Sequence, residues 1–164
     1  MKRWLRHLCA PSAPRLFPET ALERITQAIA AGETTHGGQL VFAVEESLGC
    51  GALWHGDTSR QCAERAFALL RVWDTPGNNG VLLYPLLADH AVEVVADRGY
   101  DGRIQAAQWQ QCCDMLRHRV AQGQPLGEAV EACIGDLSAL MAGAMPPGNG
   151  AAAGHGLPDH PRFL

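Results

Sequence analysis

The sequence predicts an α/β fold, a three-layer α/β/α sandwich in which about four helices flank a small mixed β-sheet. Two apolar runs of strand length are separated by one amphipathic helical stretch, and a strand–helix–strand crossover of this kind makes the two strands parallel. A third apolar run follows the second after a short turn, which predicts an antiparallel hairpin. Helical stretches before and after these strands supply the outer layers.

The first helix and the first strand follow each other closely. A helix is expected from Pro18 to Gly32, because its apolar residues repeat at helical spacing: Leu22, Ile25 and Ile29. Residues 39–45 (QLVFAVE) are rich in β-branched and aromatic side chains, which predicts a strand. The glycine-rich residues 49–56 are expected to form a loop.

A second helix is indicated by its N-terminal cap. Thr58, followed three residues later by Gln61, fits a capping box. Behind this cap, one helical stripe carries apolar side chains that are expected in the core: Cys62, Ala66, Leu69, Leu70 and Trp73. The helix is expected to stop before Pro76.

The second and third strands form the predicted hairpin. Residues 80–88 are almost continuously apolar, as in a strand that is covered on both faces. Asp89 and His90 supply the turn, and residues 92–96 supply the third strand. Pro85 has no N–H to donate, so the second strand is expected either to bulge there or to stop pairing on one side.

The rest of the chain completes the predicted organisation. Helices are expected at residues 105–122 and from about 126 to 144, each with one apolar stripe. The chain therefore divides into a basic arm at residues 1–16, a domain at residues 17–145, and a flexible Gly/Pro-rich tail at residues 146–164.

Composition and charge exclude several classes of protein. The 164 residues are 47 % apolar and 18 % charged, with a net charge of −4. Residues 1–18 carry four bases and no acid, so the remainder of the chain carries −8. An acidic body argues against a nucleic-acid partner. No apolar run reaches the roughly 18–20 residues that a membrane span needs.

The six cysteines do not have the spacing of a disulfide framework or of a zinc site, because no CxxC pattern occurs. Free thiols in a reducing compartment are expected. Three of them fall on apolar helical stripes and are expected to be buried: Cys62, Cys112 and Cys133.

Polar residues are expected to gather at one end of the sheet. The loops before the first strand, before the second strand and after the third strand meet there, because of the crossover and the hairpin. These loops carry six oxygen-bearing candidate metal ligands: Glu33, Asp74, Asn78, Asn79, Asp97 and Asp101. Carboxylate and amide oxygens suit hard cations such as Ca²⁺ or Mg²⁺. The alternative is ordinary turn and cap chemistry, with Asp97 and Arg98 in a surface ion-pair network.

Four sequence blocks together resemble the TPM domain family: residues 35–40 (THGGQL), residues 71–84 (RVWDTPGNNGVLLY), residues 86–89 (LLAD) and residues 92–99 (VEVVADRG). The resemblance covers roughly residues 17–145. It implies an α/β/α fold with a mixed sheet, a divalent-cation site in the loops at one sheet end, and an acid phosphatase activity in some members.

Residue by residue, the resemblance carries over to the same loops. Asp74, Asn78 and Asn79 match the family's acidic, amide-rich loop. Asp97 and Arg98 match its Asp/Arg–Gly turn, and Glu33 matches the glutamate that ends its first helix. Two positions depart from the family pattern. His90 stands where the family has arginine, and Pro85 replaces an aliphatic strand residue.

Two hypotheses about function follow. In the first, the chain is a stand-alone TPM-like accessory module that binds Ca²⁺ or Mg²⁺ and acts on a partner protein or a membrane protein. In the second, it is a metal-assisted acid phosphatase in which Asp74 or Asp97 acts on a metal-bound phosphate ester. A cytoplasmic location is expected, because the chain carries no signal peptide or membrane anchor of the kind that longer family members have.

The basic arm suggests a weak contact with a membrane surface. Wound as a helix, it places Trp4, Leu5 and Leu8 on one face and its cations on the other. Residues 2–15 are therefore expected to give, at most, a salt-sensitive peripheral contact with the inner membrane. The alternative is a frayed terminus or a short helix that packs on the domain.

Overall fold

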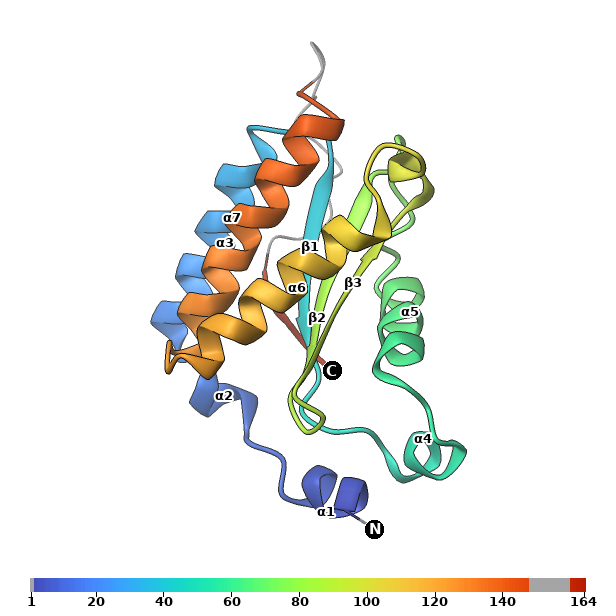
Figure 1. Cartoon of the computed structure of the whole chain (residues 1–164), viewed down its shortest axis with the longest axis vertical. Coiled ribbons are helices and arrows are strands. Elements are labelled where there is room, and N and C mark those ends of the chain that lie inside the picture. Colours follow the sequence, from blue (N-terminus) through green and yellow to red (C-terminus); the bar gives the residue numbers. More distant parts are fainter. Residues whose placement is uncertain (1, 148–159) are drawn as a thin grey trace.

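A four-stranded sheet lies at the centre of the computed structural model, which describes residues 2–147 and 160–164 (Figure 1). In spatial order the strands are β3 (Ala91–Ala96), β2 (Gly80–Leu86), β1 (Gln39–Val44) and β4 (Arg162–Phe163). β1 is parallel to β2 and to β4, whereas β2 and β3 are antiparallel. The predicted mixed sheet, with one crossover and one hairpin, is confirmed.

Three helices cover one face of the sheet. They are α3 (Glu19–Glu33), α6 (Ala106–Ala121) and α7 (Leu126–Ala144), with α3 and α7 lying side by side (Figure 1). Alternate strand residues such as Phe42 and Leu83 point into this layer and belong to the same buried cluster as Leu137 of α7. This larger core follows from the period of two along each strand and the amphipathic period of each helix.

The other face is covered by α4 (Cys50–His55) and α5 (Ser59–Leu69), which completes the three layers. The capping box of Thr58 and Gln61 is present at the start of α5, as predicted. The expectation of a loop at residues 49–56 was wrong, because α4 forms there. Gly56 ends this short helix in a left-handed conformation, and Leu53 anchors it in the core.

The prediction that Leu69 and Trp73 lie in the core was also wrong, and Leu69, the last residue of α5, is 78 % exposed. Helix α5 ends at Leu69, and Arg71 adopts a left-handed conformation with φ of 55°. This turn takes Trp73 off the helical stripe, so that its side chain is 48 % exposed. The Arg71 guanidinium lies 5.8 Å from the centre of the Trp73 ring instead.

Pro85 interrupts the sheet on one side only. The β2–β3 register runs through the pair Pro85 and Val92 without a bulge. On the other side, the β1–β2 ladder runs from Gln39 to Phe42 and resumes in the same register at Glu45. Of the two expected outcomes, the loss of pairing on one side is the one that occurs.

The N-terminal arm packs on the hairpin end of the domain. It forms α1 (Lys2–Leu8) and α2 (Ala13–Leu16), and the His7 side chain is buried. Arg3 donates to Asp89 Oδ2 from Nε at 3.0 Å and from Nη2 at 2.8 Å. The arm is therefore a docked helix, which was the alternative to a free membrane-seeking segment.

Part of the predicted tail takes up regular structure. Arg162 and Phe163 form the edge strand β4, which the tail composition did not predict. Residues 148–159 of that tail lie outside the described residues. Across residues 2–147 and 160–164, the structure holds no helix that is both long enough and apolar enough to cross a membrane.

Candidate functional site

Three loops meet at the end of the sheet where β1 and β2 begin, the upper end in Figure 1. Main-chain hydrogen bonds join them. Gln39 N donates to Asn79 O at 3.0 Å, and Gly99 N donates to Asn78 O at 2.8 Å. The loops that sequence reasoning placed together are thus in contact through their backbones.

Glycine permits the closeness of these loops. A Cβ atom on Gly80 would lie 1.9 Å from the carbonyl oxygen of Val72, and one on Gly99 would lie 2.4 Å from that of Asn78. Asn78 itself adopts a left-handed conformation with φ of 48°, which asparagine tolerates better than most residues. The loop cluster is therefore fixed by tight main-chain packing.

Asn79 is the most fully engaged polar residue of the cluster. Its backbone N–H donates to Thr75 Oγ1 at 2.9 Å, and its side-chain Nδ2 donates to Gly37 O. Tyr100 donates its hydroxyl to Asn79 O at 3.4 Å. The side-chain oxygen Oδ1 is buried and has no hydrogen-bond partner among the described residues.

Asp97 is the second residue with an unmatched oxygen. It caps the short 3₁₀ helix η1 (Arg98–Tyr100), and its Oδ1 accepts from Arg98 N at 2.8 Å. Its Oδ2 is buried and has no hydrogen-bond partner among the described residues. Asp97 and Asp101 both line a cavity of about 360 Å³ beside β3, together with Tyr100 and Trp109.

The other predicted site residues divide into two groups. Arg98 Nη2 donates to Asn78 Oδ1 at 2.9 Å, and Glu33 Oε1 accepts from Leu40 N at 3.0 Å, so both belong to the cluster. Asp74 instead faces outward. Its half-exposed carboxylate pairs with Arg71 Nη2 at 2.6 Å.

Sequence reasoning missed the contributions of Thr75 and Tyr100. Thr75 holds the backbone of Asn79, and buried Tyr100 closes the cluster from the η1 side. Burial raises the pKa of Tyr100 to about 12, so its hydroxyl stays protonated and donates. The only sequence signal was their position inside the predicted loops.

His36 is a further buried polar residue near the cluster. Its Nδ1 lies 3.0 Å from Gly38 O, and its Nε2 has no hydrogen-bond partner among the described residues. Burial lowers the pKa of His36, which the hydrogen bond to Gly38 only partly offsets, so the neutral imidazole is favoured at neutral pH.

The ligand chemistry of the cluster fits a hard cation only in part. Among residues 2–147 and 160–164, no three His, Cys, Asp or Glu side chains converge as a metal site. The atoms that do fit are Asn79 Oδ1 and Asp97 Oδ2, because a buried acceptor without a donor is costly and a cation would satisfy it.

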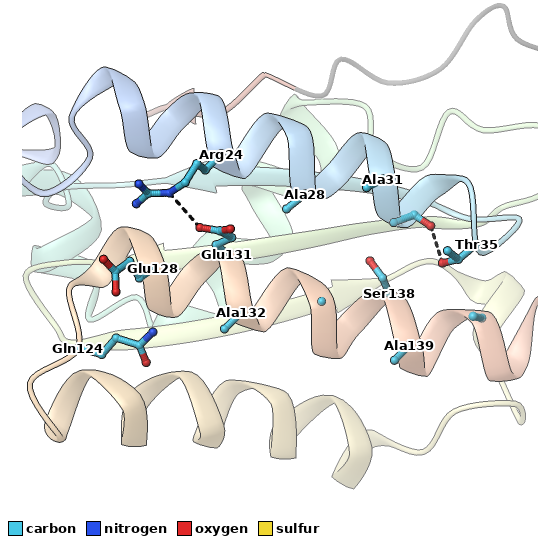
Figure 2. A pocket seen from close by; sticks show the side chains of 13 residues that line it. Arg24, Ala28, Ala31, Thr35, Gln124, Glu128, Glu131, Ala132, Ser138 and Ala139 are labelled. Atoms are coloured by element: carbon cyan, nitrogen blue, oxygen red, sulfur yellow. Dashed lines mark hydrogen bonds and ion pairs between the residues drawn. The ribbon is translucent and has the colours of Figure 1, made fainter.

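A larger but more open groove of about 950 Å³ runs between α3 and α7 (Figure 2). Alanines and glycines form most of its walls, and Arg24 pairs with Glu131 across it at 3.1 Å. Its lining also holds a second carboxylate, Glu128. Because the Arg24–Glu131 pair is solvent-exposed and the groove is open, the loop cluster remains the stronger candidate site.

These features define a class of protein, an α/β/α domain with an oxygen-rich loop cluster at the end of the sheet where the parallel strands begin. A family model, the TPM domain, matches residues 14–140, and the chain belongs to this family. The predicted family membership is confirmed.

The fold is also similar to a solved structure, the BA42 protein from the psychrophilic bacterium Bizionia argentinensis. The TM-score is 0.75 at 18 % sequence identity, over 88 % of this chain and 93 % of that chain. This likeness shows the fold alone. No curated protein matches the chain.

Proposed function

We propose that this TPM domain is a divalent-cation-binding accessory module that acts on a partner protein. The observation that supports it best is the buried, unmatched Oδ2 of Asp97. An ionised carboxylate oxygen that no N–H or O–H satisfies is stabilised by a cation more than by any neutral group.

The residues that would hold the cation are Asp97, Asp101 and Asn79. Asp97 and Asp101 line the same cavity, and Asn79 supplies the second unmatched oxygen. Ca²⁺ takes about six to eight oxygens and tolerates irregular geometry, whereas Mg²⁺ demands a near-ideal octahedron. Loops with a mixture of carboxylates, amides and carbonyls therefore favour Ca²⁺.

A titration of the full chain with CaCl₂, followed by amide chemical shifts, tests this proposal. We expect saturable shifts at Asn79, Asp97 and Asp101 at up to millimolar Ca²⁺, and weaker binding of Mg²⁺. Asp97→Asn should abolish the binding. The matched control is Asp114→Asn, because Asp114 is an exposed carboxylate on α6 that pairs with Arg117. This variant should bind Ca²⁺ as tightly as the wild type does.

Asp74→Asn measures whether this sequence-predicted ligand takes part. Because the Asp74 carboxylate faces Arg71, we expect Asp74→Asn to lose less Ca²⁺ affinity than Asp97→Asn does. The loss would come only from removing one negative charge near the site. Absence of shifts at millimolar Ca²⁺, or wild-type affinity in Asp97→Asn, contradicts the proposed site.

The second candidate function is a metal-assisted phosphatase. The exposed Arg98 guanidinium beside Asn78 favours it, because arginine binds phosphate oxygens well. Purified protein with Ca²⁺ or Mg²⁺ and p-nitrophenyl phosphate tests it. Turnover that is lost in both Asp97→Asn and Arg98→Ala supports this second function, whereas Ca²⁺ binding without turnover supports the accessory module.

We further propose a cytoplasmic location with a weak contact to the inner membrane through residues 2–15. Leu5 and Leu8 of α1 are 59 % and 77 % exposed. Arg3 and Arg6 pair with Asp89, however, which reduces their attraction to anionic lipids. Co-sedimentation with anionic vesicles should therefore be weak at low salt and absent at high salt.

A further inference from the structure

An apolar cavity of about 420 Å³ lies at the hairpin end of the domain. Its walls come from the N-terminal arm, the β2–β3 hairpin, the last turns of α6 and the start of α7. Leu86, Val92 and Leu116 are buried and form its floor. A volume of this size falls within the range of small-ligand pockets.

The cavity leaves part of an apolar helical stripe uncovered. Leu116 and Val120 lie about one turn apart on α6, and both line the cavity. Leu116 is 1 % exposed, whereas Val120 is 39 % exposed. The stripe therefore passes from the core to the open mouth of the cavity, where an apolar ligand would gain free energy by covering it.

The rim of the cavity is basic. Among the described residues of the lining, only His90 and Arg117 carry ionisable side chains, and both are exposed. Arg117 Nη2 pairs with Asp114 Oδ1, but an exposed ion pair of this kind is weak. A guanidinium has five N–H groups, so Arg117 retains donors for a second anion.

We propose that this cavity binds a single-chain anionic amphiphile of the fatty-acid class. Its chain would lie against Leu116 and Val120, and its carboxylate would accept hydrogen bonds from Arg117 or His90. A neutral apolar ligand would leave the basic rim unused, and an organic cation would be repelled by it. The volume is near the small end of ligand pockets, which favours one acyl chain over the two of a phospholipid.

This inference goes beyond the proposed cation binding and rests on other residues. The cavity lies beside the β2–β3 turn, at the opposite end of the sheet from the loop cluster. Leu5 and Leu8, on which the proposed membrane contact rests, do not line it. Asp97→Asn should therefore bind the amphiphile as the wild type does, so failure of one proposal is distinguishable from failure of the others.

Isothermal titration calorimetry of the full chain with monomeric laurate tests the proposal, and amide chemical shifts report the location. Ala121→Trp, at the exposed end of α6, places an indole at the mouth of the cavity. The matched control is Ala107→Trp, because Ala107 is an exposed alanine in the first turn of the same helix and does not line the cavity. Dodecyltrimethylammonium serves as the second probe, since it joins a chain of the same length to a cationic head.

We expect one laurate to bind per chain, with shifts confined to the hairpin turn and to residues 116–121. Shortening the acid by two methylenes should weaken binding about tenfold, because each buried methylene adds to the free energy of transfer from water. Ala121→Trp should lose most of the affinity for laurate, whereas Ala107→Trp should bind as the wild type does.

The contribution of the basic rim is measured by a second pair of variants. Arg117→Gln should weaken the binding of laurate about two- to fivefold, the effect expected of an exposed ion pair. Asp114→Asn removes the intrachain partner of Arg117, so this variant should bind laurate at least as tightly as the wild type.

Three results would overturn the proposal. The first is no saturable binding of laurate at sub-millimolar concentration, and if the protein nevertheless sedimented with anionic vesicles, a phospholipid surface would be the ligand. The second is equal affinity for dodecyltrimethylammonium, which would show that the basic rim selects nothing. The third is unchanged laurate binding by an Ala121→Trp variant whose amide spectrum shows an intact fold, which would place the ligand elsewhere.

Discussion

The two ends of the sheet are held together by different forces. At the loop-cluster end, neutral main-chain hydrogen bonds and glycine contacts fix three loops. At the hairpin end, the carboxylate of Asp89 attracts Arg3 and Arg6 of the arm. Neutral main-chain hydrogen bonds are not screened by salt, so the contacts between the loops should depend less on salt and pH than the contacts of the arm do. The chain thus combines a rigid candidate site with an arm that conditions can release.

The largest expected effect is on the rigid end. Gly80→Ala places a Cβ atom 1.9 Å from the Val72 carbonyl oxygen, and neither backbone can yield easily. We expect a loss of about 3 kcal/mol in the free energy of unfolding, at the upper end for overpacking. Urea denaturation measures it. Gly135→Ala on α7 is the control, since its Cβ would meet open space, and it should stabilise by roughly 0.5–1 kcal/mol.

The next effect is on the hairpin end. Asp89 is mostly buried and accepts hydrogen bonds from Arg3 and Arg6. The Nε2 atom of His7 lies 3.2 Å from Asp89 Oδ1 but does not have the geometry of a hydrogen bond. Asp89→Asn should lower the free energy of unfolding by about 1–3 kcal/mol. The arm should also exchange amide hydrogens faster. An unchanged arm in Asp89→Asn would show that the remaining contacts, such as the hydrogen bond from Leu48 N to His7 Nδ1, are enough to hold it.

A smaller, graded effect is expected on acidification. Burial raises the pKa of Asp89, but hydrogen bonds from Arg3 and the charges of Arg3 and His7 outweigh it, so the net pKa is lowered. A carboxyl with a lowered folded-state pKa stabilises fully above its unfolded pKa of about 4 and loses this as pH falls through the folded value. The stability difference between wild type and Asp89→Asn should therefore shrink below about pH 4.

The smallest effect leaves stability unchanged and concerns the reactivity of the cysteine thiols. Cys9 and Cys50 are exposed. Cys9 follows α1 and Cys50 begins α4, the two helices at the lower end in Figure 1. The other four thiols are buried, including the three predicted to be so, and burial raises the pKa of Cys113 to about 12. A thiol reagent should label two cysteines rapidly in the native protein. Rapid labelling of all six would contradict the helix packing.

The fold was predictable wherever local patterns agree with tertiary packing. The capping box at Thr58 and the continuously buried apolar run of β1 are visible in the sequence because each element carries its own signal. β4 has only two residues and no buried face, so its pairing depends on a partner strand distant in the sequence. Helix α4 was missed because its glycines, at Gly49 and Gly56, are caps and not a loop.

The candidate site was predictable in position but not in detail. The crossover and the hairpin bring the loops of Asn79 and Asp97 to one end. Which oxygen lacks a donor depends on side-chain orientation, which no sequence pattern encodes. Asp74 shows this, because the left-handed conformation of Arg71 lets that arginine pair with it and hold it at the surface.

The pairing of β4 with β1 also sets an order of events during synthesis of the chain. It closes a loop of more than a hundred residues, so it forms after the local hairpin of β2 and β3. A ribosome adds about 5–20 residues per second, so β1 emerges some 6 to 24 seconds before β4. Throughout that interval Ala43 and Val44 lack the strand that pairs with them in the finished domain.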